Sequence, residues 1–179
     1  MGHLEIVGYL VAILIVVFIV WQNSNKERQE KKRKEEEFKY SYKYPRLAMT
    51  VDALVLAGKI NPKKVLLIQR KFDPFMGFWA LPGGFVGMDE TLKAACSREL
   101  FEETGLKNIP LKQFYTFDAI ARDPRHRTVT TVFYGEVDDV LTVHGGDDAS
   151  EAKWFEISDL PEVAFDHGDI IRKFMSEKL

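Results

Sequence analysis

Residues 84–106 read GFVGMDETLKAACSRELFEETGL, a glycine-containing start followed by a segment rich in alanine and glutamate. The part from Thr91 to Thr104 predicts a helix, because Gly105 directly after it is a good left-handed C-terminal stop. The glutamates gather toward the end of this helix, so its chemistry is concentrated in its last two turns.

Three carboxylates share one face of the predicted helix. Glu99, Glu102 and Glu103 stand at i, i+3 and i+4, within about 100° of one another around the axis. They repel one another and face the negative end of the helix dipole, so a positive partner must offset them. Arg98 can pair with Glu102 or hold a neighbouring carboxylate. By itself this spacing favours a solvated helix face.

The loop before the helix favours a metal site over a solvated face. Residues 81–84 read LPGG and allow unusual backbone angles and close approach, so the Gly84 carbonyl can serve as a further oxygen ligand. Hard divalent cations prefer oxygen ligands and usually sit between carboxylates and substrate phosphates. Loop and helix together predict a Mg²⁺ site, with Mn²⁺ as the alternative ion.

The same stretch matches every fixed position of a family signature and resembles the Nudix box. Nine constrained positions at fixed spacing are far more specific than a short motif. The positions are filled by Gly84, Glu90, Arg98, Glu99, Leu100, Glu102, Glu103, Gly105 and Leu106. The resemblance implies an α/β fold, specifically an α/β/α sandwich with a mixed sheet, in which water attacks phosphorus of a diphosphate.

Roles for the box residues follow from this resemblance. It implies that Glu99, Glu102 and Glu103 bind metal, that the Gly84 carbonyl joins them, and that Arg98 and Glu90 orient the site. The general base varies between branches of the family. Glu151, at the end of the acidic stretch 147–151, is the candidate, and a metal-bound carboxylate such as Glu99 is the alternative.

The substrate must be inferred from outside the box. Residues 70–75, 79–82, 115–117, 122–127 and 164–167 resemble the ADP-ribose pyrophosphatase branch, and the likeness spans residues 44–175. An arginine cluster can bind phosphates and an aromatic ring can stack on adenine. The predicted contacts are Arg70, Arg122, Arg125, Arg127 and Phe117, with Tyr115 as the alternative ring. The competing interpretation makes the arginines solvated charges and the rings core.

The expected reaction is therefore metal-dependent hydrolysis of ADP-ribose to AMP and ribose 5-phosphate. One rival is a pyrophosphatase acting on nucleoside triphosphates or oxidised nucleotides, and another is a non-catalytic ADP-ribose sensor. A membrane scaffold is a third, which the carboxylate site argues against. Nucleic acid is not an expected partner, because the net charge is -2 and the pI is near 6.1. The resemblance also leaves a homodimer open.

The N-terminal part differs in composition from the rest. An uncharged apolar run begins at Ile6 and ends at Trp21 (residues 6–21), which predicts a membrane anchor. As a helix it would span about 24 Å, somewhat less than a bilayer core of ~30 Å. No basic n-region or small-x-small pattern accompanies it, so we expect an uncleaved anchor in residues 1–22 rather than a signal peptide.

Basic residues all follow this run, and they predict the orientation. Lys and Arg near a membrane segment stay on the cytoplasmic side, so the N-terminus is expected outside and the catalytic domain in the cytoplasm. Residues 23–43 mix both charge signs and predict a solvated linker whose basic half can touch anionic lipid. The basic residues are Lys26, Arg28, Lys31, Lys32, Arg33 and Lys34.

Residues 44–179 predict one catalytic domain. At 179 residues with 46% hydrophobic content, the chain can fill a single core beside its appendage. Cys96 is the only cysteine and is expected to be a buried, inert helix residue. Apolar and aromatic runs predict strands at 47–57, 64–70, 112–121, 128–137 and 152–157, and a second helix at 165–178.

Overall fold

The structure is a computed structural model that describes residues 21–22, 42–58, 64–146 and 148–178. The chain divides into two units, Met1–Arg46 and Leu47–Leu179. Within the described residues, no helix has both the length and the apolar character needed to cross a membrane. The anchor predicted at residues 6–21 lies outside them except for Trp21, which is helical. The anchor and most of the linker therefore stay predictions.

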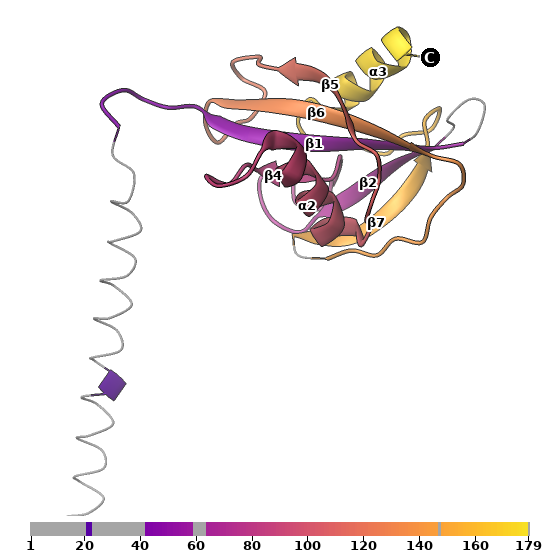
Figure 1. The fold of residues 1–179 in the computed structure, drawn as a ribbon, viewed down its shortest axis with the longest axis horizontal. Coiled ribbons are helices and arrows are strands. Elements are labelled where there is room, and N and C mark those ends of the chain that lie inside the picture. The colour runs from indigo at the N-terminus through magenta and orange to yellow at the C-terminus, as the bar shows by residue number, and fades with distance from the viewer. Residues whose placement is uncertain (1–20, 23–41, 59–63, 147, 179) are drawn as a thin grey trace, which may run out of the picture. The chain divides into compact units, whose positions relative to one another are not determined.

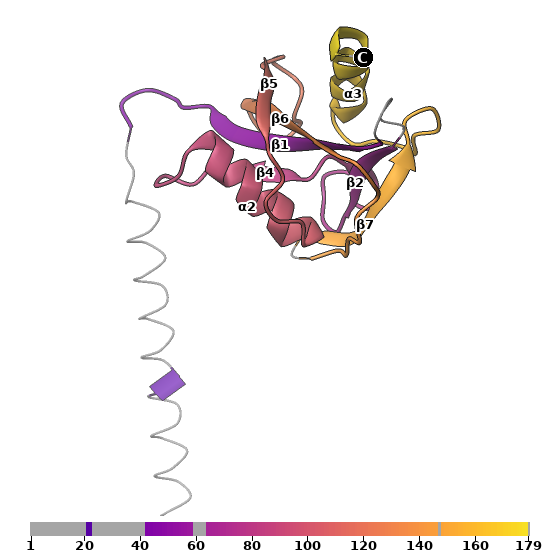
Figure 2. The same cartoon turned by 45° about the vertical axis from the view of Figure 1, so that its right-hand side comes forward.

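The second unit is a mixed sheet with a helix on either side (Figures 1 and 2). The predicted α/β fold with a mixed sheet is confirmed. The strands are β1 (Ala48–Ala57), β2 (Lys64–Arg70), β3 (Trp79–Ala80), β4 (Gly83–Phe85), β5 (Lys112–Phe117), β6 (Thr128–Val137) and β7 (Ala149–Glu156), and the helices are α2 (Leu92–Thr104) and α3 (His167–Lys178).

Strand β1 is the centre of the sheet and is buried for most of its length. It runs parallel to β6 from Ala48↔Thr128 to Ala57↔Val137, and β5 closes that side as an antiparallel edge. Buried on both faces, such a strand reads as a nearly continuous apolar run, which is why its sequence lacks strict alternation.

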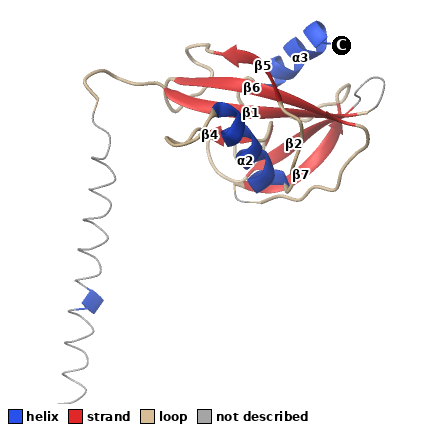
Figure 3. Cartoon of the chain, in the orientation of Figure 1, coloured by secondary structure: helices blue, strands red, loops and turns tan. Residues whose placement is uncertain are grey.

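The two sheet faces build separate cores. Val51, Ala53 and Val55 of β1 point to the α2 side, where they meet Cys96 and Leu100. The alternate β1 residues point to the α3 side and pack with Ile170, Ile171 and Phe174. Figure 3 shows α2 and α3 on opposite sides of the strands. Period-two alternation thus assigns each β1 side chain to one helix.

Strands β1 and β2 pair only at one end, and their divergence makes room for the site. They are antiparallel partners at Leu56↔Val65 and Ala57↔Lys64. Continued in this register, Asp52 would face Gln69, but it faces Gly83 of β4 instead. β2 turns away to pair with β3 and β7. The segment between β3 and β4 therefore lies where the sheet splits.

Most predicted boundaries agree with the structure. β2 and β6 match, β5 ends at Phe117 instead of residue 121, β7 starts at Ala149 instead of residue 152, and α3 starts at His167 instead of residue 165. The short strands β3 and β4 were not predicted. They are too short for any periodic pattern and exist because β1 and β2 supply partners for their backbone groups.

Candidate active site

A cavity of about 510 Å³ opens where β1 and β2 diverge. This volume suits a nucleotide-sized ligand. Its lining includes five carboxylates that we call the acidic wall, namely Asp52, Glu99, Glu102, Glu103 and Asp148. It also includes three arginines that we call the basic wall, namely Arg70, Arg122 and Arg125. A ligand in this cavity would meet groups of both charge signs.

The ends of helix α2 fix the three box carboxylates. The Thr91 hydroxyl accepts a hydrogen bond from Ala94 N–H and caps the start, and Gly105 ends the helix in the left-handed region at φ 76°. Glu103 lies on the buried face of α2, and its Oε2 accepts from Gly83 N–H at 2.9 Å. Glu99 and Glu102 lie at the border of that face, half-buried.

Arg98 ties the carboxylates of the box together. Its Nη1 donates to Glu99 Oε1 at 2.7 Å and to Glu102 Oε2 at 2.9 Å. Its Nε and Nη2 donate to the two oxygens of Glu90, at 3.1 and 2.7 Å. Arg98 Nη2 also reaches the Phe85 carbonyl at 3.2 Å. The orienting roles expected for Arg98 and Glu90 are consistent with these contacts, because Arg98 aligns two cavity carboxylates while Glu90 aligns Arg98.

Burial and mutual repulsion raise the pKa values of the inner carboxyls. Burial raises the pKa of Glu103 to about 8, opposed by the Gly83 N–H and reinforced by the charges of Glu99 and Asp52. Burial also raises the pKa of Glu99, with Arg98 opposing. Negative charge on this wall is thus only partly compensated, which is the electrostatic state that a bound cation relieves.

The acidic wall fits a divalent cation in its donor chemistry. A Cβ on Gly84 would lie 2.5 Å from Glu99 Cδ, so only glycine lets the carboxylate lie against this backbone. Across the described ranges, no three of the acidic, histidine or cysteine side chains already converge as one metal-binding group. The reason is geometric: Glu99 and Glu102 are turned toward Arg98, and Glu103 is turned toward Gly83.

The basic wall is built from arginines that are held by other groups. Arg122 donates to both oxygens of Asp166, at 2.9 and 2.6 Å, and its side chain is buried. Arg125 donates to both oxygens of Asp123, at 3.0 and 2.8 Å. Desolvation favours protonation of buried Asp123, but the hydrogen bonds from Arg125 outweigh it and lower the pKa of Asp123 to about 2. The Asp123–Arg125 pair is therefore ionised.

Buried polar residues connect the floor of the cavity to the loop before α2. Asp52 Oδ2 accepts from the Thr130 hydroxyl at 2.6 Å, and Asp52 Oδ1 lies 3.5 Å from His167 Nε2. His167 Nδ1 accepts from Leu81 N–H at 2.9 Å, which assigns the ring proton to Nε2. His167 is the first residue of α3, and this hydrogen bond fixes the chain at Leu81.

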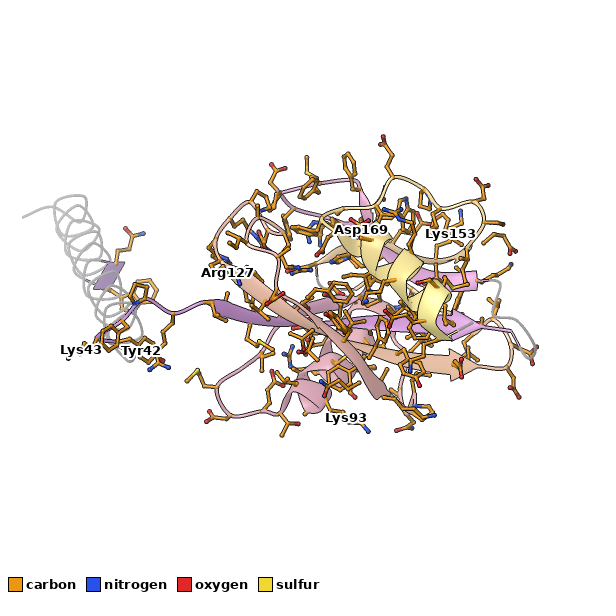
Figure 4. The ribbon with its side chains drawn as sticks, turned by 90° about the horizontal axis from the view of Figure 1, so that it is seen from above. Tyr42, Lys43, Lys93, Arg127, Lys153 and Asp169 are labelled. Carbon is orange, nitrogen blue, oxygen red and sulfur yellow. The ribbon has the colours of Figure 1, made fainter. Side chains whose placement is uncertain are left out.

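Five predicted site residues are not among those that line this cavity: Arg98 and Glu90, whose contacts are given above, and Glu151, Phe117 and Arg127. Glu151 is exposed on β7 opposite Gln69, whereas Asp148 of the same acidic stretch lines the cavity. Phe117 packs with Phe114 at the end of β5. Arg127, labelled at the start of β6 in Figure 4, donates to the Ala119 carbonyl. Arg70, Arg122 and Arg125 do line the cavity as expected.

Asp52, Asp148, Phe165 and His167 line the cavity without having been assigned a site role from the sequence. A signal existed for Asp52, because it is an acidic residue inside the apolar run VDALVLA, and a buried carboxylate in such a run needs partners. Phe165 and His167 lie far from the box in the sequence, so only the fold brings them to it.

Comparisons with known proteins agree on the nature of this domain. The NUDIX domain matches residues 46–175. The chain is 40% identical over 137 residues to the ADP-ribose pyrophosphatase of Methanocaldococcus jannaschii, covering 75% of this chain and 77% of that protein. It is 31% identical to the ADPR responsive transcriptional repressor NtrR of Acinetobacter baylyi, covering 73% of this chain but 54% of the repressor.

A solved structure is also similar. The NUDIX domain of Shewanella oneidensis NrtR, crystallised with ADP ribose, has a TM-score of 0.70 and 30% identity, over 81% of this chain and 97% of that one. The relatives therefore include one protein named as an enzyme and one named as a transcriptional repressor.

Proposed function

The chain belongs to the Nudix family and is a Nudix hydrolase, and from that premise we propose that it hydrolyses ADP-ribose to AMP and ribose 5-phosphate. The observation that carries this proposal is a single cavity lined by both carboxylates and arginines. A diphosphate in it would have both metal-binding oxygens and guanidinium groups as partners. The similarity to an ADP-ribose pyrophosphatase supports the choice of substrate.

Divalent ions, Mg²⁺ first and Mn²⁺ as the alternative, would be held by Glu99, Glu102 and Glu103 with the Gly84 carbonyl. When bound, such ions neutralise the diphosphate oxygens and lower the pKa of coordinated water. Arg98 aligns Glu99 and Glu102 before any ligand arrives.

The reaction also needs a group that accepts the proton of the attacking water. Asp148 is the better candidate because it lines the cavity, whereas Glu151 is exposed on β7 outside it. Glu151 remains the alternative, and Glu99 is a third candidate that lies on the acidic wall. In each case the water oxygen bonds to phosphorus, the carboxylate takes a proton, and the bond to the bridging oxygen breaks.

A sensor is the rival with an observation behind it, since one relative is an ADPR responsive repressor. The complete box favours an enzyme, because a protein that only binds ADP-ribose does not require Glu99 and Glu103, two carboxyls with raised pKa values, in its cavity. A triphosphate pyrophosphatase is the second rival, and the acidic wall alone would serve it equally well.

One substrate panel separates these functions. The full chain is incubated with Mg²⁺ or Mn²⁺ and ADP-ribose, NADH, dinucleoside polyphosphates, nucleotide sugars or 8-oxo-dGTP, and the products are resolved by chromatography. We expect AMP and ribose 5-phosphate from ADP-ribose. Pyrophosphate release from triphosphates without ADP-ribose turnover would contradict the substrate, and tight ADP-ribose binding without turnover would indicate a sensor.

We also propose that residues 6–21 anchor the enzyme in the cytoplasmic membrane with its catalytic domain in the cytoplasm. The uncharged run and the basic residues after it support this orientation. Fractionation of the full chain and of residues 22–179 tests it: equal solubility would contradict the anchor. Light scattering on the shorter chain determines whether it is a monomer or the homodimer that the resemblance leaves open.

A further inference from the structure

The three arginines of the basic wall differ in what holds them. Arg122 and Arg125 are each paired with both oxygens of an aspartate, Asp166 and Asp123. Arg70 is held by backbone carbonyls instead: Nε donates to Pro74 O at 2.8 Å and Nη2 to Phe72 O at 3.3 Å. Carbonyl groups fix a guanidinium without neutralising it, so Arg70 keeps its charge for another partner.

The position of Arg70 is unfavourable for a cation that lacks an anion. Burial and the nearby charge of Arg125 lower the pKa of Arg70, only partly offset by Glu103, Asp123 and Asp148. Among the described residues, no carboxylate lies within ion-pair distance of its guanidinium. An anionic ligand in the cavity would remove this imbalance, and Arg70 lines that cavity.

The Phe165 ring lies near the guanidinium groups of both Arg70 and Arg125. The guanidinium carbon of Arg70 lies 4.9 Å from the centre of the Phe165 ring, and that of Arg125 lies 5.6 Å from it. The negative face of an aromatic ring attracts a guanidinium at such distances. The ring therefore offsets part of the repulsion between two like charges that the fold brings together.

The backbone around Phe165 is fixed in an uncommon conformation. Its φ is 53°, which is rare for a residue with a bulky side chain. The turn is held on both sides, because Ala164 N–H donates to Trp79 O at 2.7 Å and Asp166 is bound by buried Arg122. Phe75 packs edge-on against the ring at 4.8 Å. These contacts give Arg122 and Asp166 a role in holding Phe165.

We propose that Arg70 is the basic-wall cation that contacts the substrate diphosphate, and that Phe165 is a positioning residue that holds Arg70 beside Arg125 for this contact. The inference rests on the proposed function. It assigns unequal roles to the arginine cluster: Arg70 binds ligand, Arg122 fixes the turn that carries Phe165, and Arg125 is neutralised by Asp123.

The test compares substitutions at positions 70 and 165 with matched controls. Arg70→Gln should lower kcat/KM for ADP-ribose by about 10- to 100-fold, the range of a hydrogen bond to a charged group. Phe165→Leu should raise KM by about 3- to 30-fold, the range of a desolvated cation–π contact, with little change in kcat. Phe165→Tyr keeps the ring and should stay within about 2-fold of wild type.

Matched controls exclude general damage to the fold. Arg172→Gln removes an exposed arginine of α3, and Phe155→Leu removes a half-buried ring of β7 outside the cavity. Both should leave KM unchanged. Calorimetric binding of ADP-ribose without metal, together with thermal melts, gives a second readout: Phe165→Leu should weaken binding while Phe165→Tyr does not.

Three outcomes would overturn the proposal. An Arg70→Gln variant with unchanged KM and unchanged affinity would show that Arg70 does not contact the ligand. An equal rise in KM in Phe165→Tyr and Phe165→Leu would show that the ring does not position Arg70. If Phe165→Leu does not fold, Phe165→Met is compared with Phe165→Tyr on the same criteria. Wild type that neither binds nor hydrolyses ADP-ribose would defeat the proposed function and this inference together. If wild type hydrolyses ADP-ribose and the position 70 and 165 variants have unchanged KM, only this inference is contradicted.

Discussion

The two walls of the cavity obtain their charge in opposite ways. The acidic wall takes three of its five carboxylates from neighbouring turns of α2, and a single arginine, Arg98, serves two of them. The basic wall collects its arginines from β2 and from the segment before β6, and two of the three bring their own aspartates. The acidic wall is thus left with excess charge, whereas the basic wall is largely neutralised within the protein.

Under the proposed function, this difference assigns the reaction to the acidic wall and ligand recognition to the basic wall. A metal ion held by the carboxylates would have a large effect on the rate. The arginines would contribute orientation through Arg70, which pairs with no carboxylate of the described residues. Substitutions in the acidic wall should therefore act mainly on kcat, and substitutions in the basic wall mainly on KM.

The largest effect is expected from neutralising a carboxylate of the acidic wall. Glu102→Gln and Glu103→Gln should each abolish metal-dependent turnover, because each removes a predicted metal ligand while keeping the shape of the side chain. Steady-state kinetics across a Mg²⁺ titration measures this, and circular dichroism checks that the fold is intact. Near-wild-type activity in both variants would overturn the assignment of the metal site.

The second-largest effect is expected from removing the carboxylate that accepts the proton of the attacking water. Asp148→Asn should lower kcat by about 100-fold or more, the low end of the range for loss of a general base. Glu151→Gln serves as its matched partner, since Glu151 is exposed outside the cavity, and should change kcat by less than about 3-fold on the scale of an exposed surface change. The reverse ranking in a kcat measurement would make Glu151 the base.

Arg98 should matter less than the carboxylates it aligns. Arg98→Lys keeps the charge but cannot bridge Glu90, Glu99 and Glu102 at once, so activity should fall by about 10- to 100-fold, as for other groups that support metal ligands. The concentration of Mg²⁺ needed for half-maximal rate should rise as well. An Arg98→Lys variant with unchanged metal dependence would show that metal binding does not require Arg98 to align Glu99 and Glu102.

Substitution of His167 should change the free energy of unfolding modestly, by an amount that depends on pH. Burial lowers the pKa of His167 below 6.5, although Asp52 opposes the shift. The folded protein thus keeps this ring neutral, while the unfolded chain binds a proton below about pH 6.5. Stability should fall as the pH drops through this window, and His167→Gln should remove that slope.

Urea unfolding at several pH values measures this effect. At pH 7.5, His167→Gln should cost about 1 kcal/mol, the scale of one hydrogen bond. The gap to wild type should narrow at pH 5.5, because only wild type loses stability through this ring. An equal gap at both pH values would contradict a neutral buried His167.

The smallest effect is expected at Arg127, the cluster arginine outside the cavity. Arg127→Gln should change KM for ADP-ribose by less than about 2-fold, because its contact is an exposed hydrogen bond to the Ala119 carbonyl. A KM increase comparable to that of Arg70→Gln would show that Arg127 contacts the substrate, for example across a homodimer contact.

How much the sequence could predict follows the same division between the walls. Helix spacing places Glu99, Glu102 and Glu103 on one face, and Gly105 predicts where the helix ends, so the acidic wall could be inferred from a short stretch. The strand pairing that brings Arg70 to Phe165 depends on contacts between segments some 95 residues apart in the chain. No local pattern encodes such a juxtaposition.

Errors at the edges of the site have physical causes as well. Phe117 and Arg127 have suitable chemistry, but the turn between β5 and β6 places them away from the cavity. Asp148 lies within the acidic stretch 147–151 that the sequence pointed to. Which residue of this stretch faces the cavity depends on where β7 begins. Residue type could be predicted there, while register could not.

The pairing of β4 with β1 constrains how this protein could diverge during evolution. Asp52↔Gly83, Val51↔Gly84 and Thr50↔Phe85 fix the loop before α2 to β1, which is buried for most of its length. An insertion of one residue between β3 and β4 would shift this register and turn the loop's backbone groups away from α2. The segment between β2 and β3 has no pairing with β1, but its Phe72 and Pro74 carbonyls hold Arg70. Lineages of this domain should therefore keep the length of 81–84 constant.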